Sequence, residues 1–309
     1  MNDKTSLTPD VFRINALGWC SQIEAFIRDK FCSSHRDGIV VSISGGLDSS
    51  VTAALCVRAV GKDKVVGMML PELLGNPEAN IYGRLIADHL DIKTVKFNIS
   101  SILRGLGTAD FFLAAISGRE FWKAGVNKSL AKRGKSAARQ YEEFLKGTLD
   151  EGGRKLIAKV NAKQRARLLA EYKFADEHNY LVAGSAHKTE GTVGLFVKFG
   201  VDDCADIMPL KNIYRSQTLQ LGECLGIPKE ILGRSPNPDI LPGITDKYIG
   251  YFDMDYQKID MIIWGLEHGM DDESIAAAIG IDSKSVDWIR EIVRLSENYH
   301  NHDTVPHLE

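Results

Sequence analysis

The chain has little cysteine, no excess of one charge and no long apolar run, and each of these shortages excludes a class of protein. Its 309 residues include five cysteines without C-x-x-C spacing, which indicates neither a disulfide framework nor a zinc site. A net charge of −3 gives no general reason to expect a nucleic acid or a membrane as partner. No segment is apolar enough to span a bilayer or to act as a secretory signal. We therefore expect a cytoplasmic protein with reduced thiols.

The sequence does contain short apolar runs that alternate with helical patterns. The expected strands are 39–43, 65–70, 94–99, 180–184 and a run near 205–210, and the expected helices are 49–60, 78–90 and 163–177. This alternation is typical of right-handed β-α-β units on a parallel sheet. It predicts a doubly wound, Rossmann-like α/β fold in which helices flank the parallel sheet.

A single domain over residues 1–309 is expected, with helical segments outside this alternation. Thr8 and Pro9 resemble the N-cap and the first position of a helix that precedes the first strand. Residues 107–153 are helix-prone, basic and bounded by glycines, which predicts an inserted helical segment. Residues 254–309 are expected to form a C-terminal helical segment.

The first expected strand leads into Ser44-Gly45-Gly46-Leu47-Asp48-Ser49-Ser50 and then into a helix. Small residues between a strand and a helix let backbone N–H groups and the positive end of the helix dipole converge on one point, which suits pyrophosphate. The serine hydroxyls can add donors. Asp48 would repel bare phosphate and therefore implies a bridging cation, most naturally Mg²⁺. The alternative is a tight turn with Asp48 in the first helical turn, where a carboxylate is stabilised anyway.

The loop lacks the lysine of G-x-x-x-x-G-K-[ST] and is not G-x-G-x-x-G, so it implies a different nucleotide chemistry. It resembles the pyrophosphatase loop of the N-type ATP pyrophosphatases, which have a fold of the adenine nucleotide α-hydrolase type. Further motifs are similar, in order and spacing, to those of the ammonia-dependent NAD synthetase family: NAKQRAR at 161–167, GSAHKTE at 184–190, KFG at 198–200, ADIMPL at 205–210 and LGIP at 225–228. The chain is therefore identified as a divergent member of that family.

The resemblance implies an ATP-dependent amidation. The carboxylate of deamido-NAD would attack the α-phosphorus of ATP, Mg²⁺-pyrophosphate would leave, and ammonia would convert the acyl-adenylate to NAD and AMP. The resemblance also implies a homodimer with its small-molecule substrates near the interface.

Transferred motif by motif, the resemblance assigns roles to residues of this chain. Asp48 and Glu190 would bind Mg²⁺ and, with Arg215, would be the catalytic residues. The expected ATP contacts are Ser44, Gly45, Gly46, Asp48, Ser49, Ser50, Ser185, Arg215 and Asn237. The expected contacts to the acceptor substrate are Arg165, Lys198, Asp202 and Asp206.

The sequence departs from the family pattern at several of these positions. Arg215 stands where a lysine is usual, Asp202-Asp203-Cys204 replaces Asp-Gly-Gly, and Asn237 replaces a hydroxyl residue. These departures leave open that the acceptor is a different carboxylate. A nucleotide-binding regulator without turnover is a further alternative.

RNA modification is the least favoured alternative. Residues 119–167 hold 14 Lys and Arg against 5 Asp and Glu, which is a candidate phosphate-binding patch. Few aromatic side chains are interleaved there, so the stacking of bases is poorly supported. Nucleic acid is therefore not the expected partner.

Overall fold

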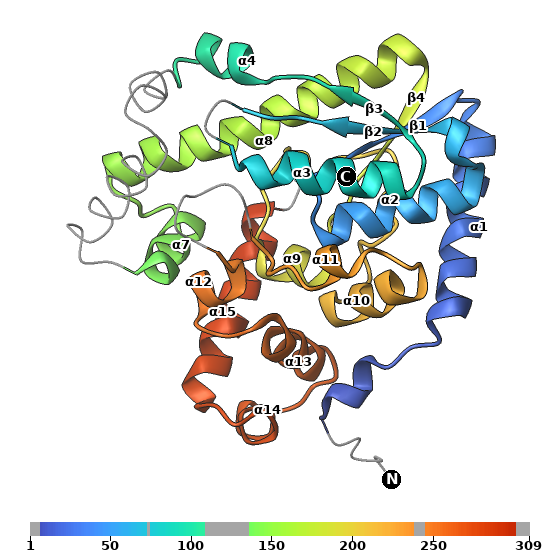
Figure 1. The fold of residues 1–309 in the computed structure, drawn as a ribbon. Helices are drawn as coiled ribbons and strands as arrows, with labels where there is room; N and C mark the ends of the chain where they lie inside the picture. The colour runs from blue at the N-terminus through green and yellow to red at the C-terminus, as the bar shows by residue number, and fades with distance from the viewer. Residues whose placement is uncertain (1–6, 73–74, 109–135, 238–244, 301–309) are drawn as a thin grey trace, which may run out of the picture.

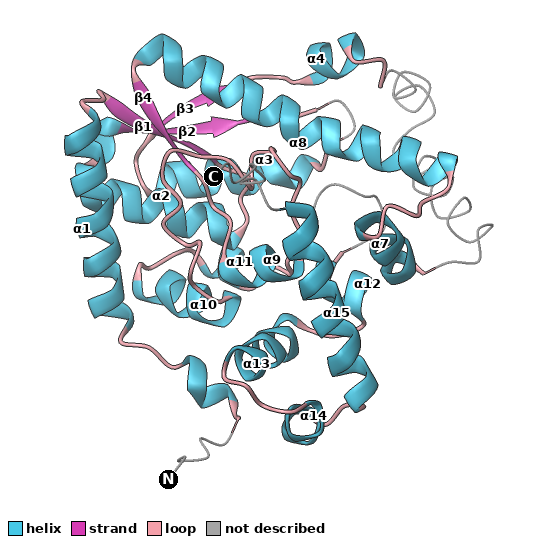
Figure 2. Cartoon of the chain, turned by 180° about the vertical axis from the view of Figure 1, so that it is seen from behind, coloured by secondary structure: helices cyan, strands magenta, loops and turns pink. Residues whose placement is uncertain are grey.

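The computed structural model describes residues 7–72, 75–108, 136–237 and 245–300, and helices cover both faces of a small central sheet (Figure 1 and, from behind, Figure 2). Four parallel strands lie in the order β3-β2-β1-β4. Their bounds are β1 Gly38–Ser42, β2 Val65–Met69, β3 Lys93–Lys96 and β4 Tyr180–Ala183. Ile39 of β1 is paired with Val65 of β2 and with Leu181 of β4. The predicted doubly wound parallel α/β fold is confirmed.

The central strand β1 contributes side chains to two apolar cores. The helices around the sheet are α1 Ala16–Ser34, α2 Leu47–Val60, α3 Pro77–His89, α4 Ser100–Gly105, α8 Glu151–His178, α10 Arg215–Cys224 and α11 Lys229–Leu232, and η2 is Lys62–Lys64. Ile39 and Val41 pack with α1, α2, α3 and α10, whereas Val40 packs with α4 and α8. Because side chains alternate across a strand, one continuous apolar run fills the core on each face of the sheet.

The predicted fifth strand near 205–210 is wrong. Ile207 makes only an isolated parallel bridge, with Ala183 of β4. The side chain of Asp206 accepts a hydrogen bond from the backbone N–H of Val182 at 2.8 Å, and Pro209 has no N–H to donate. The Asp206 side chain thus replaces a backbone carbonyl as the acceptor for Val182, and Pro209 lacks the N–H that a strand residue would donate. The described sheet therefore ends at β4.

The first helix and α8 begin elsewhere than predicted. Thr8 precedes only the short η1 (Pro9–Phe12) and makes no side-chain capping bond. Asn15 caps α1 instead, because its side chain accepts from the N–H of Gly18. Asp150 caps α8 in the same way, and this helix therefore starts at Glu151, well before the predicted start at 163.

A helical layer lies on one side of the sheet domain, below the sheet in Figure 1, and is formed by helices from the middle and from the C-terminal part of the chain. Its helices are α7 Ala137–Leu145, α9 Lys188–Val193, α12 Lys247–Phe252, α13 Tyr256–Glu267, α14 Asp272–Ile279 and α15 Ser283–His300. They share one apolar cluster, in which Tyr248, Ile262 and Ile289 are fully buried. The described part of the predicted insertion contains α7 and the start of α8. Residues 109–135 lie outside the described ranges, so the limits 107–153 stay a prediction.

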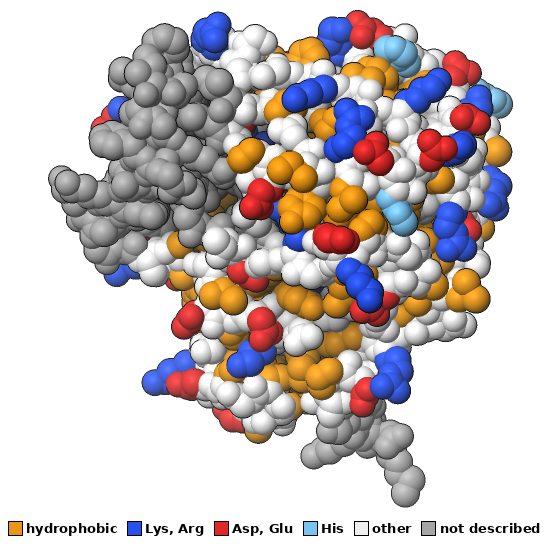
Figure 3. All heavy atoms as spheres, viewed as in Figure 1, with side chains coloured by type: hydrophobic (Ala, Val, Ile, Leu, Met, Phe, Trp, Pro, Cys, Tyr) orange, Lys and Arg blue, Asp and Glu red, His pale blue; other side chains and the backbone are white. Residues whose placement is uncertain are grey.

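The surface shows no strong preference for one charge on the face drawn in Figure 3, where basic and acidic side chains are intermingled. Among the helices of the described ranges, none combines the length and the apolar composition needed to cross a bilayer.

Candidate active site

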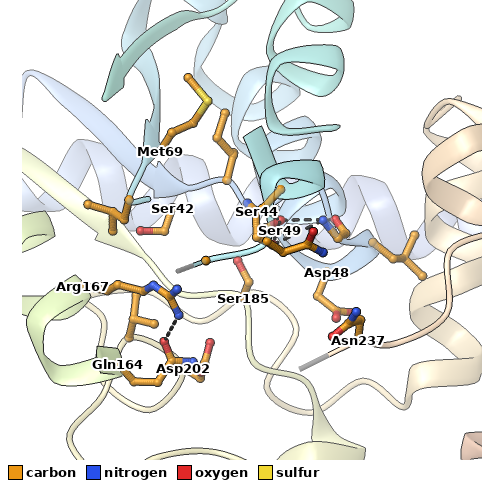
Figure 4. Close-up of a pocket in the computed structure, with 18 of the residues that line it drawn as sticks. Ser42, Ser44, Asp48, Ser49, Met69, Gln164, Arg167, Ser185, Asp202 and Asn237 are labelled. Atoms are coloured by element: carbon orange, nitrogen blue, oxygen red, sulfur yellow. Dashed lines mark hydrogen bonds between the residues drawn. The ribbon is translucent and has the colours of Figure 1, made fainter. Parts of the chain in front are cut away.

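A cleft opens at the carboxyl ends of β1 and β4, where α2 begins (Figure 4). Ser44 lines it from the loop after β1, Asp48 and Ser49 line it from the first turn of α2, and Ser185 lines it from the segment after β4. The hydroxyls of Ser44 and Ser49 lie 3.3 Å apart. Gly46 is the N-cap of α2 and also lines the cleft, so the first N–H groups of the helix, which have no intrahelical acceptor, are close by. This end of the sheet is suited to binding an anion.

Gly45 and Ser50 shape the loop from outside the cleft. Gly45 has a φ of +71°, and a Cβ on it would collide with Tyr82 of α3. Ser50 is buried, and its hydroxyl donates to the carbonyl of Gly46 at 2.7 Å. Neither residue lines the cleft, so the structure places these two predicted ATP contacts in the support of the loop.

Two carboxylates from different helices meet in the cleft. Asp48 lies in the first turn of α2 and Glu190 in the first turn of α9. One ligand atom each from Asp48, Glu190 and His187 lie within 4.8 Å of one another. Carboxylate oxygens are ligands that Mg²⁺ prefers, whereas a ring nitrogen suits it less. The predicted pair Asp48 and Glu190 fits a magnesium ion.

Each of these carboxylates is also paired with a buried cation. Arg215, the first residue of α10, donates to Asp48, and Lys247, the first residue of α12, forms an ion pair with Glu190. Burial would raise the pKa of Asp48, but Arg215 and other nearby positive charges outweigh it and lower that pKa. Burial lowers the pKa of His187 to about 3 and that of Lys247 to about 8. At neutral pH the histidine is therefore neutral, while the lysine is mostly charged in its ion pair with Glu190.

The opposite wall of the cleft is a hydrogen-bonded group on α8 and the segment that follows α9 (Figure 4). Gln164 donates to Asp202 at 2.7 Å and accepts from Arg167 at 2.6 Å. Burial raises the pKa of Asp202 to about 6, although Arg167 opposes this rise. The predicted acceptor residue Asp202 thus lies in the cleft.

The other three predicted acceptor residues do not line the cleft. Arg165 donates to the carbonyl of Lys198 at 3.1 Å, whereas Arg167 lines the cleft, because residues two apart on a helix do not share a face. The Lys198 ammonium donates to the carbonyl of Tyr299 at 3.0 Å. Asp206 supports the edge of β4 as described above. Within a single chain, these three predicted residues therefore lie away from the loop after β1.

A family model described as NAD synthase matches residues 19–116 and 127–302 of the chain. The chain belongs to the NAD synthase family. A protein of Methanocaldococcus jannaschii named NH(3)-dependent NAD(+) synthetase is 32% identical to it, over 90% of this chain and 92% of that protein. One of the same name from Thermotoga maritima is also 32% identical, over 89% of this chain and 94% of that protein.

Solved structures share the fold of this NAD synthase family member. The structure of NMN synthetase from Francisella tularensis matches with a TM-score of 0.69 and 23% identity, covering 96% of this chain and 100% of that chain. The NH3-dependent NAD synthetase from Campylobacter jejuni matches with a TM-score of 0.66 and 19% identity, with the same two coverages.

Asn237, the last of the ATP contacts predicted from the sequence, lines the cleft. Lys247 and Arg234 also line it, but the sequence analysis did not predict them. Arg234 donates to the carbonyl of Gly45 at 2.9 Å, and its guanidinium lies 4.0 Å from the centre of the Tyr82 ring. Both basic residues come from segments far from the loop along the chain. No local signal distinguishes them from solvated charges, so their place could be found only from the fold.

Proposed function

We propose that the protein catalyses the ATP-dependent amidation of deamido-NAD with ammonia, which yields NAD, AMP and pyrophosphate. The supporting observation is that the loop 44–50, Glu190 and Arg215 converge on one cleft at the carboxyl end of the sheet. The relatives whose names state this activity are matched over nearly their full length.

The loop after β1 and the start of α2 would bind the phosphates of ATP. The first N–H groups of α2 and the hydroxyls of Ser44 and Ser49 are donors there, and Arg215 and Lys247 are buried cations. When the acceptor carboxylate attacks the α-phosphorus, the bond to the β-phosphate breaks and negative charge grows on pyrophosphate. Donors and cations that are already in place stabilise this charge without reorganisation.

Asp48 and Glu190 would hold Mg²⁺, which when bound supplies further positive charge to the leaving pyrophosphate. With the two carboxylates engaged in this way, Arg215 and Lys247 can turn to the phosphates that they face. In the second step ammonia attacks the acyl carbon of the adenylate, AMP leaves with the bonding electrons, and one proton passes to solvent.

A second candidate function is the amidation of another carboxylate. Of the four residues expected to contact deamido-NAD, Asp202 lines the cleft and the others lie outside it. The phosphate side would act in the same way for either acceptor, so product analysis with several acceptors decides between them.

We also propose a homodimer whose interface completes the acceptor site. Arg165 and Lys198 contact each other outside the cleft. Leu169, one turn further along α8, is 61% exposed, and Phe199 is 50% exposed. Apolar side chains of this size beside charged ones suit a protein interface. Light scattering should give a dimer for the wild type and a monomer for F199E, and a monomeric wild type would overturn this proposal.

The activity is tested by incubating the purified protein with MgATP, ammonium chloride and deamido-NAD and measuring NAD, AMP and pyrophosphate together. We expect equal amounts of the three products, and none when deamido-NAD is left out. AMP formed with another nicotinate nucleotide but not with deamido-NAD would support the second candidate. AMP formation that depends on RNA would contradict both.

A further inference from the structure

One buried carboxylate contacts the starts of two helices that carry residues of the candidate active site. Asp260, on α13, is fully buried and does not line the cleft. One of its oxygens accepts a hydrogen bond from the hydroxyl of Thr189, in the first turn of α9. The other accepts from the backbone N–H of Ser216, in the first turn of α10, at 2.8 Å. Asp260 therefore connects both helix starts from behind the cleft.

The start of α10 takes its hydrogen-bond acceptors from other helices. The N–H of Arg215 donates to the Thr189 hydroxyl at 2.9 Å, and the next N–H along the chain donates to Asp260. Burial raises the pKa of Asp260 to about 6, so the carboxyl is mostly ionised at neutral pH and both of its oxygens accept. The first N–H groups of a helix have no intrahelical acceptor, so the groups that accept from them fix where the helix begins and how it is rotated.

Glu267, two turns further along α13, contacts the same two helix starts. Its carboxylate forms an ion pair with Lys188, the first residue of α9, at 2.7 Å. It also accepts from the hydroxyl of Tyr214, the N-cap residue of α10. Asp260 and Glu267 are seven residues apart and therefore share one face of the helix. This face of α13 holds the starts of α9 and α10 at two points, of which that at Asp260 is the buried one.

The position of the Arg215 side chain depends on where α10 begins. Arg215 is the first residue of that helix, and its guanidinium donates to Asp48 in the cleft. The guanidinium also lies 5.9 Å from the centre of the ring of Tyr256, a further residue of α13. A rotation or shift of the first turn of α10 would move this cation relative to Asp48. A displacement of about 1 Å at a positioned group can reduce a rate about 10²-fold.

We propose that Asp260 is a positioning residue, which acts through Thr189 and the first turn of α10 to keep Arg215 directed into the cleft. The inference rests on the proposed function in one respect, namely that Arg215 acts on the phosphates of ATP. Asp260 itself does not contact the substrate and takes no part in the chemical steps.

The test uses variants that break these hydrogen bonds with little change in volume. D260N keeps the shape of the side chain, but its NH₂ group cannot accept, so one of the two helix starts loses its acceptor. T189V removes the hydroxyl that accepts from Arg215, and T189S restores it. D287N makes the same change as D260N at an exposed position of α15 and is the matched control. Circular dichroism of the full-length variants checks that each is folded.

The first arm measures nucleotide affinity without turnover. α,β-Methylene-ATP with Mg²⁺ is titrated calorimetrically into the wild type, D260N, R215A and the double variant. We expect D260N to weaken binding about threefold to tenfold and R215A about tenfold or more. If Asp260 acts through Arg215, the double variant should bind within about twofold of R215A, because the same interaction is lost only once. T189V should resemble D260N, whereas T189S and D287N should stay within about twofold of the wild type.

The second arm repeats the same cycle on the kcat of NAD formation. D260N and T189V should each lower kcat about tenfold or more in the wild-type background, and T189S should recover it to within about threefold. In the R215A background D260N should change kcat by less than about twofold. A role of Asp260 in holding the helices together, independent of Arg215, would lower kcat by the same factor in both backgrounds.

Additive losses in both cycles, or wild-type affinity and kcat in D260N and T189V, would overturn the inference. If D260N does not fold, T189V and T189S carry the same test with the smaller change. Because the affinity cycle needs no acceptor, its result does not depend on the reaction catalysed. Affinity losses that are not additive, in a protein that forms no NAD, would support the inference while the proposed function fails. Formation of NAD together with additive losses would do the reverse.

Discussion

The two sides of the cleft are built in different ways. The side proposed to bind the phosphates comes largely from one short strand-loop-helix junction, in which Ser44, Asp48 and Ser49 are neighbours in sequence and in space. The side proposed to bind the acceptor is assembled from one face of α8 and from a segment more than thirty residues away, as the hydrogen bond from Gln164 to Asp202 shows. A junction fixes its groups through local backbone geometry, whereas a helix wall depends on which face the packing turns inward. The first can be predicted from a motif, and the second requires the fold.

The substitution D48N should produce the largest effect, because Asp48 belongs to the strand-loop-helix junction itself. Removing this negative charge from the proposed magnesium site should lower the rate of NAD formation by about 10²-fold to 10³-fold at saturating substrates. The exposed Asp63, changed to Asn, provides a matched control and should leave the rate unchanged. A near-normal rate in D48N, with the fold checked by circular dichroism, would contradict the role of this carboxylate.

The substitution R215A tests the contribution of a remote residue to the same side. Arg215 is 5% exposed, and its loss leaves Asp48 without its main positive partner. We expect a loss of about 3 kcal/mol in the free energy of unfolding, measured with urea at neutral pH. R215K keeps the charge and should lose clearly less. Equal stability of R215A and the wild type would show that the pair is not coupled to folding.

A pH series on E171Q sharpens the comparison on the other wall. The pKa of Glu171 is raised by burial from 4.5 to about 8 on folding, so the folded state binds more protons than the unfolded state between these values. The contribution of Glu171 is therefore fully present below pH 4.5 and is lost as the pH rises toward 8. Relative to E171Q, the wild type should lose about 2 kcal/mol of unfolding free energy between about pH 6 and about pH 8. A difference between the two proteins that stays constant over this range would mean that the carboxyl is ionised throughout.

The pair R167A and R165A tests the choice of helix face directly and should give the smallest effect. Arg167 lines the cleft, so R167A should raise the KM of a substrate about tenfold. R165A should change it by less than about threefold under conditions in which the oligomeric state is unchanged. The opposite order of effects in steady-state kinetics would mean that the other face of α8 meets the substrate.

Much of the sheet and the phosphate loop could be predicted from sequence, because β1 and the start of α2 are specified by residues next to one another. The predicted fifth strand was wrong because Asp206 and Pro209 interrupt a ladder that apolar periodicity alone suggests. The first helix was given Thr8 as its cap because Pro9 follows it, whereas Asn15 supplies the capping bond. Periodicity describes burial, and it does not show where a side chain takes over a backbone hydrogen bond.

Within the site, the motifs predicted that Asp48, Glu190 and Arg215 act together, but they did not predict the ion pairs of Asp48 with Arg215 and of Glu190 with Lys247. Lys247 reaches Glu190 from the start of α12, more than fifty residues later in the chain. Arg234 and Glu171 were missed for the same reason, since each is an ordinary charged residue until the fold buries it or brings it to the loop.

The most direct measurement of the central claim is the exchange of labelled pyrophosphate into ATP, with MgATP and deamido-NAD present and ammonia absent. If the cleft forms an acyl-adenylate, the first step runs in both directions and label enters ATP only when deamido-NAD is present. D48N should reduce this exchange as strongly as it reduces NAD formation. Two results would contradict the proposal that the loop at Ser44–Ser50 supports adenylation of this acceptor. One is exchange that does not need deamido-NAD, and the other is no exchange at all in a protein that binds ATP.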